Sequence, residues 1–340
     1  MRLINIQRIK TCFIIASLFL ILSASPAAAR RISVGNDDNQ DYSSIQAAVD
    51  AAKPGDTVYV YSGFYRENVD LDKEITVRSI TGRPELHIVK AKNPGDHVFH
   101  VHSNNVTISG FSIKGANNPD KAGIYLENTR GVMISNNNLS DNRLGICLED
   151  STTNMLNLNK ASGNMVGILL KTSEGNLVMN NRVDVNSLEG ILLQASDLNR
   201  LNGNILRLNQ EHGLLLSNSS RNLIFDNFFY NAANVGYSGT NLENTWNISK
   251  RRGVSIAGGP YLGGNYWTAP DEALCVIEDL NEDKICDVSY DLGEGNIDHM
   301  PLIRSGRIVQ PAHIITIFLL ASALIGLVLI VYITRRILRW

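Results

Sequence analysis

The sequence predicts an all-β protein that forms a right-handed parallel β-helix of about nine coils. Three observations support this fold. Five apolar segments that begin with glycine return every 22 or 23 residues, at 123–126, 145–148, 167–170, 190–193 and 213–216. Asparagines recur with the same spacing, among them Asn159, Asn181, Asn204 and Asn227. The apolar pieces span only three or four residues, which is too short for a helix pair but suits three short strands per coil.

Each strand is expected to pair with its equivalent one coil further on, at roughly 4.8 Å. The crossover rule makes such a coil right-handed. Asparagine suits the corners because it tolerates left-handed backbone, and stacked asparagine amides can bond along a ladder. Strand alternation then directs Ile124 and Leu126, with their equivalents, into an aliphatic core.

The alternate positions of the same strands face outward and form an apolar stripe. Its members are Tyr125, Cys147, Leu169, Leu192 and Leu215. Contiguous exposed apolar surface usually marks contact with a partner. We therefore expect the stripe to dock a protein or a second copy of the chain, and coverage by a loop of the same chain is the alternative.

The elements before the repeats indicate export and a capped first coil. Residues 1–29 have a basic start, an apolar middle and the small residues 27–29, as a signal peptide does. Residues 30–55 form a polar leader and a short amphipathic helix, apolar at 45, 48, 49 and 52. Ser43 and Gln46 fit a capping box, and Pro54-Gly55 ends the helix. The helix is expected to cover the open apolar end of the repeats at 56–250.

The elements after the repeats predict attachment to a membrane. A C-terminal cap at 251–304 and a linker at 305–313 lead to an uncharged apolar stretch at 314–333. That stretch is long enough to cross a bilayer, and the arginines of 334–340 place the tail in the cytoplasm. The protein is thus predicted to be single-pass and type I, with its bulk periplasmic or on the cell surface.

The predicted outer domain is acidic. The formal net charge of the whole chain is −2, and removing the three basic residues of the signal gives −5. Leaving out the three arginines of the tail gives −8. This balance argues against a nucleic-acid partner, which needs a basic face.

Several stretches resemble the NosD-like proteins of the pectin-lyase-like superfamily, whose repeats also occur in carbohydrate-binding and sugar-hydrolase domains. The first runs from Pro54 to Glu67, and the more specific ones are Gly263-Gly264-Asn265-Tyr266-Trp267 and 296–302. The resemblance covers about residues 40–304. It implies an extracytoplasmic binding or accessory protein whose partner is carbohydrate or a membrane complex. The type member of the family assists the maturation of a copper enzyme alongside an ABC transporter, and the resemblance implies that a similar role is possible here.

The C-terminal cap carries a candidate calcium loop and a candidate disulfide. Asp279, Asn281, Asp283 and Asp287, with the carbonyl of Ile285, match the first part of an EF-hand-type loop. Lys284 stands where the loop needs glycine and Tyr290 where it needs an acid, so a solvated acidic turn is the alternative. Cys275 and Cys286 are predicted to pair, since disulfides form readily in exported chains, with two free thiols as the alternative.

Catalytic candidates are weak, and so is the case for bound copper. Glu127 with Glu149, and Glu189 with Glu211 and His212, have the spacing that glycoside hydrolysis requires, but acidic stacks usually form a solvated face. His100 and His102 share one strand face, with His97 nearby. Copper or zinc usually takes three or four such ligands, so copper rests on the family resemblance alone.

The sequence therefore predicts a membrane-anchored extracytoplasmic β-helix with a binding or accessory role. A polysaccharide lyase or glycoside hydrolase and a structural envelope protein are the alternatives, because function lies in a site and not in the scaffold.

Overall fold

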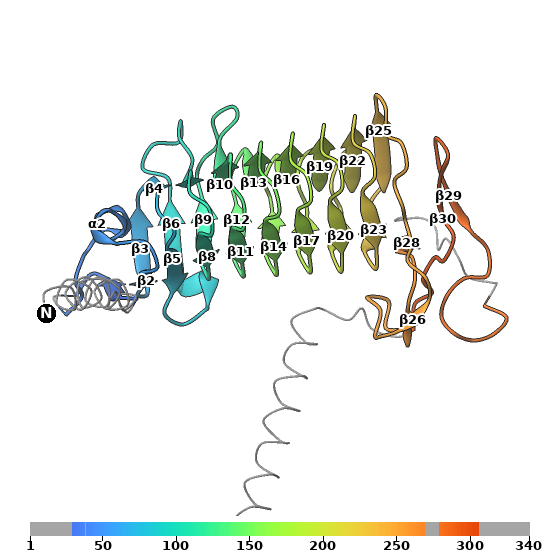
Figure 1. Cartoon of the computed structure of the whole chain (residues 1–340), viewed down its shortest axis with the longest axis horizontal. Coiled ribbons are helices and arrows are strands. Elements are labelled where there is room, and N and C mark those ends of the chain that lie inside the picture. Colours follow the sequence, from blue (N-terminus) through green and yellow to red (C-terminus); the bar gives the residue numbers. More distant parts are fainter. Residues whose placement is uncertain (1–28, 38, 269–278, 306–340) are drawn as a thin grey trace, which may run out of the picture.

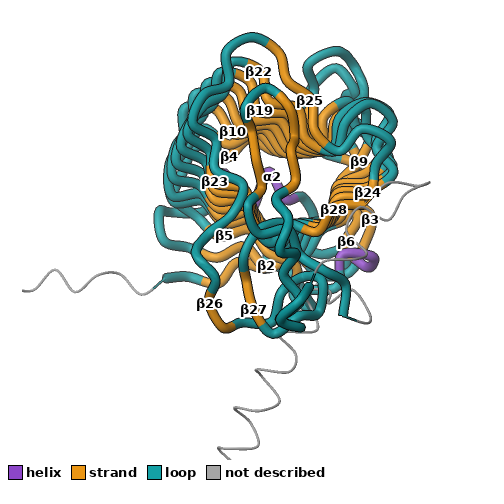
Figure 2. Tube along the Cα trace, turned by 90° about the vertical axis from the view of Figure 1, so that its right-hand side faces the viewer, coloured by secondary structure: helices purple, strands orange, loops and turns teal. Residues whose placement is uncertain are grey.

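Three parallel sheets, each built from one short strand per coil, form the walls of a long solenoid. The computed structural model describes residues 29–37, 39–268 and 279–305, and Figure 1 shows the coils stacked from α2 at one end to β29 and β30 at the other. Figure 2 looks along the stack at the three walls, which we call sheets A, B and C in chain order. The predicted all-β parallel solenoid of about nine coils is confirmed.

The sheets contain nine, nine and eight strands, all paired in parallel. Sheet A holds β1 (Arg31–Val34), β2 (Thr57–Val60), β5 (Thr76–Ser79), β8 (Thr107–Ser109), β11 (Met133–Ser135), β14 (Met155–Asn157), β17 (Leu177–Met179), β20 (Arg200–Asn202) and β23 (Leu223–Phe225). Sheet B holds β3 (Gly63–Arg66), β6 (His87–Lys90), β9 (Ser112–Lys114), β12 (Asn138–Ser140), β15 (Lys160–Ser162), β18 (Arg182–Asp184), β21 (Ile205–Arg207), β24 (Phe228–Tyr230) and β28 (Tyr266–Thr268). Sheet C holds β4 (Val69–Leu71), β7 (Phe99–Val101), β10 (Ala122–Glu127), β13 (Leu144–Glu149), β16 (Val166–Lys171), β19 (Ile191–Gln194), β22 (Leu214–Ser217) and β25 (Val235–Ser238).

Inward-facing aliphatic residues fill the solenoid. In sheet C the inner positions of successive coils are Phe99, Ile124, Ile146, Ile168, Ile191 and Leu214, all fully buried. Each residue stacks on its equivalent one coil away, so the walls enclose one continuous core. Burial of this kind contributes about 1.5–3 kcal/mol per large aliphatic side chain.

Asparagine ladders hold the corners between the sheets. Along the corner from sheet A to sheet B, the Oδ1 atoms of Asn159, Asn181, Asn204 and Asn227 each accept hydrogen bonds from the preceding coil. A second ladder runs through Asn154, Asn176, Asn199 and Asn222. A third, from Asn142 through Asn164 and Asn186 to Asn209, was not recognised in the sequence. The residue before each ladder asparagine has a positive φ, as at Leu158 (58°) and Asn180 (57°), so each corner needs left-handed backbone.

The repeated glycines accompany the third ladder. A Cβ on Gly145 would lie 3.1 Å from the Nδ2 atom of Asn164 and would also meet the carbonyl oxygen of Gly167. Gly123 and Gly190 have the same close neighbours, one ladder amide and one carbonyl of the next coil. The 22- or 23-residue glycine period therefore comes from a close approach of backbone and ladder at this corner.

The N-terminal cap differs from the predicted one in two ways. The helix is α2 (Ile45–Ala51), and its N-cap is Ser44 rather than Ser43. The predicted capping box with Gln46 does not form, because Glu67 of the first coil accepts hydrogen bonds from the backbone N–H groups of Ile45 and Gln46. The leader also contributes strand β1, which pairs with β2 and places the start of sheet A before the helix.

The C-terminal cap packs on the end of the core and on the outer face of sheet B. The indole of Trp267 stacks on Phe229 at 4.4 Å, and Trp246 is 1% exposed. The hairpins β26 (Arg251–Arg252) with β27 (Tyr261–Leu262) and β29 (Tyr290–Gly293) with β30 (Asn296–Asp298) belong to this cap. A separate apolar cluster joins Ile205 and Phe228 of sheet B to Ile256, Ile285 and Leu302 of the cap.

The two predicted membrane-associated segments, 1–29 and 314–333, lie almost wholly outside the described residues. Among the residues that are described, no helix has the length and apolar character to cross a bilayer.

Candidate metal centre

His100 of strand β7 and His102, the first residue after that strand, lie on the outer face of sheet C. Phe99 and Val101 are fully buried, so alternation along the strand turns both histidines outward. Asp70 of β4 lies directly opposite His100 on one side, and Tyr125 of β10 lies opposite it on the other. Three neighbouring coils thus bring their polar side chains to one place.

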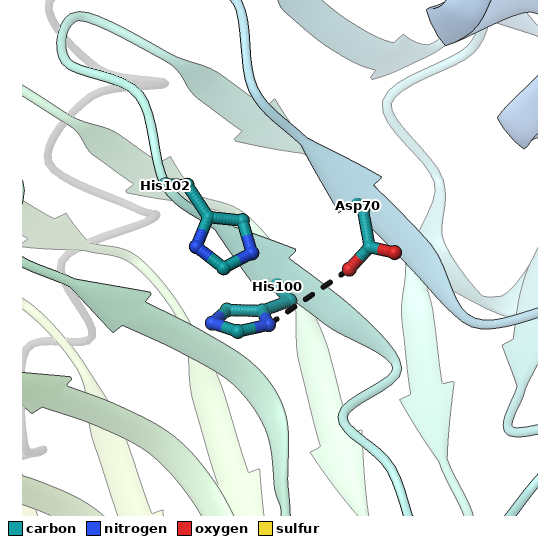
Figure 3. Close-up of side chains that lie close together, drawn as sticks. All are labelled: Asp70, His100 and His102. Carbon is teal, nitrogen blue, oxygen red and sulfur yellow. Dashed lines mark ion pairs between the residues drawn. The ribbon is translucent and has the colours of Figure 1, made fainter.

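The imidazoles and carboxylates of this cluster converge. One ligand atom from each of Asp70, His100 and His102 lies within 4.8 Å of the others. Figure 3 shows these three side chains close together. His100 Nδ1 is 3.8 Å from Asp70 Oδ1, and His100 Nε2 is 3.1 Å from Glu127 Oε2. Glu127 Oε2 is also 3.4 Å from His102 Nδ1, so this carboxylate faces both rings. We call these four residues the His–carboxylate cluster.

The cluster is open to solvent on one side. The side chain of His100 is 18% exposed, that of His102 41% and that of Asp70 68%. Burial and the neighbouring His102 lower the pKa of His100, which keeps its imidazole neutral at neutral pH. A neutral imidazole offers the nitrogen lone pair that binds a metal.

His97, the third histidine noted in the sequence, has a different role. Its Nδ1 accepts the backbone N–H of Ala122 at 3.1 Å, and its ring stacks on Tyr125 at 4.2 Å. Burial lowers the pKa of His97 to about 4. His97 therefore supports the wall beside the cluster and keeps Tyr125 in place.

The Glu127 and Glu149 pair does not form two free carboxylates. Glu149 lies one coil beyond Glu127, and it accepts hydrogen bonds from the hydroxyl of Tyr125 at 2.7 Å and from Lys171 Nζ at 2.6 Å. These bonds, that of Lys171 first, lower the pKa of Glu149. Glu127 thus faces the histidines, while the charge of Glu149 is balanced by Lys171. A catalytic acid and base pair would instead have two carboxylates facing the same bond.

The other catalytic candidates do not assemble into a site. The carbonyl of His212 accepts the N–H of Gly190, which places Glu189 and His212 in adjacent coils. Within the described part of the chain, no side-chain hydrogen bond or ion pair joins Glu189, Glu211 and His212, and His212 Nδ1 is buried without a partner. Glu211 is exposed.

The acidic loop of the C-terminal cap is closed by its own hydrogen bonds and by lysines. Asp279 accepts from the backbone of Asp283 and Lys284 and from Lys284 Nζ, while Asp283 pairs with Lys250. Asp287 accepts from the backbone of Leu280, and the side chain of Asn281 and the N–H of Ile285 also bond within the loop. Lys284 has a φ of 68° where a calcium loop has glycine.

Cys286 is disulfide-bonded, and its predicted partner Cys275 lies outside the described residues.

The apolar stripe continues the row that holds His100. The register runs from Asp70 through His100 and Tyr125 to Cys147, Leu169, Leu192 and Leu215. The stripe is less exposed than alternation predicts, because Leu144 and Val166 pack beside it and Cys147 is only 3% exposed. Tyr125, Leu169 and Leu192 remain half-buried at its surface.

Sequence and structure comparisons now assign the chain to a family. The profile described as periplasmic copper-binding protein (NosD) matches residues 49–272 of the 340 residues. The chain belongs to the NosD family. The match includes every residue of the His–carboxylate cluster.

Other known proteins are similar to this chain in sequence or in fold. A cell surface glycoprotein of Methanothermus fervidus is 30% identical over 132 residues, which are 38% of this chain and 21% of that protein. The chain thus spans about a fifth of the length of this relative. DFA-IIIase from Arthrobacter chlorophenolicus A6, without its lid, has a TM-score of 0.52 at 14% identity, covering 63% of this chain and 70% of that one. Pectate lyase Pel9A has a TM-score of 0.45 at 14% identity, covering 63% and 80%. The expected resemblance to the NosD-like proteins is confirmed by the family match, and the solved structures show a likeness of fold alone.

Proposed function

We propose that this protein binds a divalent transition metal, copper above all, outside the cytoplasm. The observation that carries the proposal is the convergence of Asp70, His100 and His102 within 4.8 Å on an open sheet face. Imidazole and carboxylate ligands suit Cu²⁺, Ni²⁺ and Zn²⁺, and Cu²⁺ binds such nitrogen and oxygen sites most tightly. The copper-binding description of the family supports the same choice.

The four residues have different parts in this proposal. His100 and His102 supply the nitrogen ligands and Asp70 an oxygen ligand. Glu127, which faces both rings, orients them and adds negative charge beside the cation. Three protein ligands on an exposed face leave coordination positions free, which suits a metal that is passed on rather than one that holds the fold together.

The position of the His–carboxylate cluster beside the apolar stripe also supports an accessory role. Because the apolar stripe begins at Tyr125, directly beside His100, a protein docked on the stripe would lie next to the metal. We propose that an envelope protein that accepts the metal docks there. Residues 314–333 would tether the domain to the membrane, in line with the periplasmic description of the family and the cell surface relative.

Metal titration of the purified full chain tests this function. Isothermal titration with Cu²⁺, Zn²⁺ and Ca²⁺ should show one tight site, with Cu²⁺ bound most tightly and Ca²⁺, which prefers oxygen ligands, bound least tightly there. The double variant His100→Gln/His102→Gln should lose that site. Glu127→Gln should weaken it by about 10–100-fold, as the loss of an orienting partner does.

The matched control changes two histidines elsewhere, His212→Gln/His299→Gln. It should retain the tight site. Equal copper affinity in wild type and in the His100→Gln/His102→Gln variant would rule out the proposed centre.

A further inference from the structure

The outer face of sheet B carries an unusual row of cations. One basic side chain projects from each of six strands: Arg66, Lys90, Lys114, Lys160, Arg182 and Arg207. They come from seven consecutive coils, and only β12 contributes none. Among the residues of these seven strands, Asp184 is the one acid. Arg66, Lys90, Lys114 and Arg207 share one register position, and Lys160 and Arg182 lie two residues earlier on their strands, so the cations form a band two positions wide. We call these six residues the basic row.

The fold itself does not require this row. Arg66 lies directly opposite Lys90, and Lys90 lies directly opposite Lys114. Like charges placed opposite each other across paired strands destabilise a sheet. Within the described residues, Arg66, Lys90, Lys114 and Lys160 make no ion pair that would relieve the repulsion. The row also runs against the net charge of the predicted outer domain, which is −8.

Asp184 holds Arg182 and Arg207 in place through their Nε atoms and leaves their Nη groups available to bind a ligand. Arg182 Nε donates to Asp184 Oδ2 at 2.7 Å, and Arg207 Nε donates to the same oxygen at 3.2 Å. The carboxylate of Asp184 is 2% exposed, whereas the arginine side chains are 33% and 38% exposed. Their Nη groups donate to no atom within the described part of the chain. Such fixed guanidinium groups suit bidentate binding of carboxylate or sulfate.

The spacing of the row points to a linear ligand. Coils rise by about 4.8 Å, so the basic row extends for about 29 Å along the solenoid axis. An extended acidic polysaccharide presents an anionic group at intervals of similar size. Figure 2 places strands β3, β6 and β9 on a wall separate from that of β4 and β10, so this ligand would not compete with the His–carboxylate cluster.

We propose that the outer face of sheet B binds a linear acidic polysaccharide along the basic row. Charge complementarity selects an anion, and the regular rise of the coils selects an extended polymer. The anionic group is a carboxylate or a sulfate, which this surface binds by the same hydrogen bonds.

Retention of the purified full chain on immobilised polymers tests the proposal. Polygalacturonate supplies carboxylates, chondroitin sulfate supplies sulfates, and a neutral glucan supplies neither. Wild type should bind at least one acidic polymer and pass through the glucan. Retention by polygalacturonate alone would identify the group as a carboxylate, and retention by the sulfated polymer above all would identify it as a sulfate.

The variant Lys90→Gln/Lys114→Gln/Lys160→Gln should lower the affinity by at least about tenfold, since three charge-assisted contacts are lost. These lysines are preferred to Arg182 and Arg207, whose loss would leave Asp184 buried without its partners. The control Lys53→Gln/Arg130→Gln/Arg252→Gln removes the same charge from exposed positions outside the row and should bind as wild type does.

Equal weakening by the control would show an effect of net charge alone and would overturn the proposal. So would equal retention on the neutral glucan. Binding to vesicles of phosphatidylglycerol but to neither acidic polymer would make the membrane surface the ligand of the row, which also overturns it.

Discussion

At the scale of single residues, the corners of the coil show most clearly how the sequence produces the fold. Each corner pairs one residue in left-handed backbone with one buried asparagine or serine. Val185, exposed and with a φ of 57°, shows that the position before the ladder tolerates even a β-branched residue. The buried amide of Asn186 that follows is the constrained part, because it bonds to backbone groups of the preceding coil and to the amide of Asn209 in the next.

Asn181→Ala should therefore destabilise the solenoid. The Oδ1 of Asn181 accepts from the backbone N–H and Nδ2 of Asn159, and its Nδ2 donates to the carbonyl of Leu156. Leaving these buried groups without partners should lower the free energy of unfolding by about 2–4 kcal/mol. Chemical denaturation followed by circular dichroism measures the change. Asn138→Ala, the same substitution at a half-buried outward position, should alter it by less than about 0.5 kcal/mol. Similar losses in both variants would contradict the role of the ladder.

At the scale of elements, the C-terminal cap depends on a buried carboxylate. Asp298 of β30 is fully buried, and it accepts hydrogen bonds from the N–H of Asn265 and from Trp267 Nε1. Burial raises the pKa of Asp298 to about 6 despite these donors. Burial also raises the pKa of Asp226, at the same end of the solenoid, to about 7.

The pH dependence of the cap follows from these pKa values. Between about pH 4 and pH 6–7 the folded chain binds protons at Asp298 and Asp226 that the unfolded chain has released, so this part of the stability falls as the pH rises. The variant Asp298→Asn should reduce the amount by which the protein is more stable at pH 5 than at pH 8. Because His97 contributes in the opposite direction, the measurement is the difference in melting midpoint between variant and wild type at each pH.

The matched control for the cap is Asp291→Asn, at an exposed position of β29. It should leave the pH dependence of the melting midpoint as it is in wild type. An unchanged pH dependence in Asp298→Asn would contradict the assignment of the raised pKa.

The regular elements could be predicted from the sequence and the irregular ones could not. The 22- or 23-residue period gave the core positions and two asparagine ladders. The third ladder, which runs from Asn142 to Asn209, was not predicted, although its asparagines recur with the same spacing. Strand β1 was missed because its partner β2 follows the helix, so nothing local marks it as part of a coil.

At the scale of the whole molecule, the carboxylates of the His–carboxylate cluster could not be predicted because the first coils are irregular. His100 pairs with Asp70, 30 positions earlier, and contacts Glu127, 27 positions later. Both separations differ from the repeat of the later coils, so register could not be read from the sequence there. His100 and His102 alone gave two ligands, and only the folded chain supplies the carboxylates on either side. The solenoid thus carries the His–carboxylate cluster on sheet C and the basic row on sheet B, on separate walls.

The most direct test of the central claim is the electron paramagnetic resonance spectrum of the full chain loaded with one equivalent of Cu²⁺. The proposed site predicts a single Cu²⁺ species with hyperfine coupling to two imidazole nitrogens, reduced to one in His100→Gln or in His102→Gln. A spectrum with oxygen ligands alone, or one that both substitutions leave unchanged, would contradict the assignment of this face as the copper site.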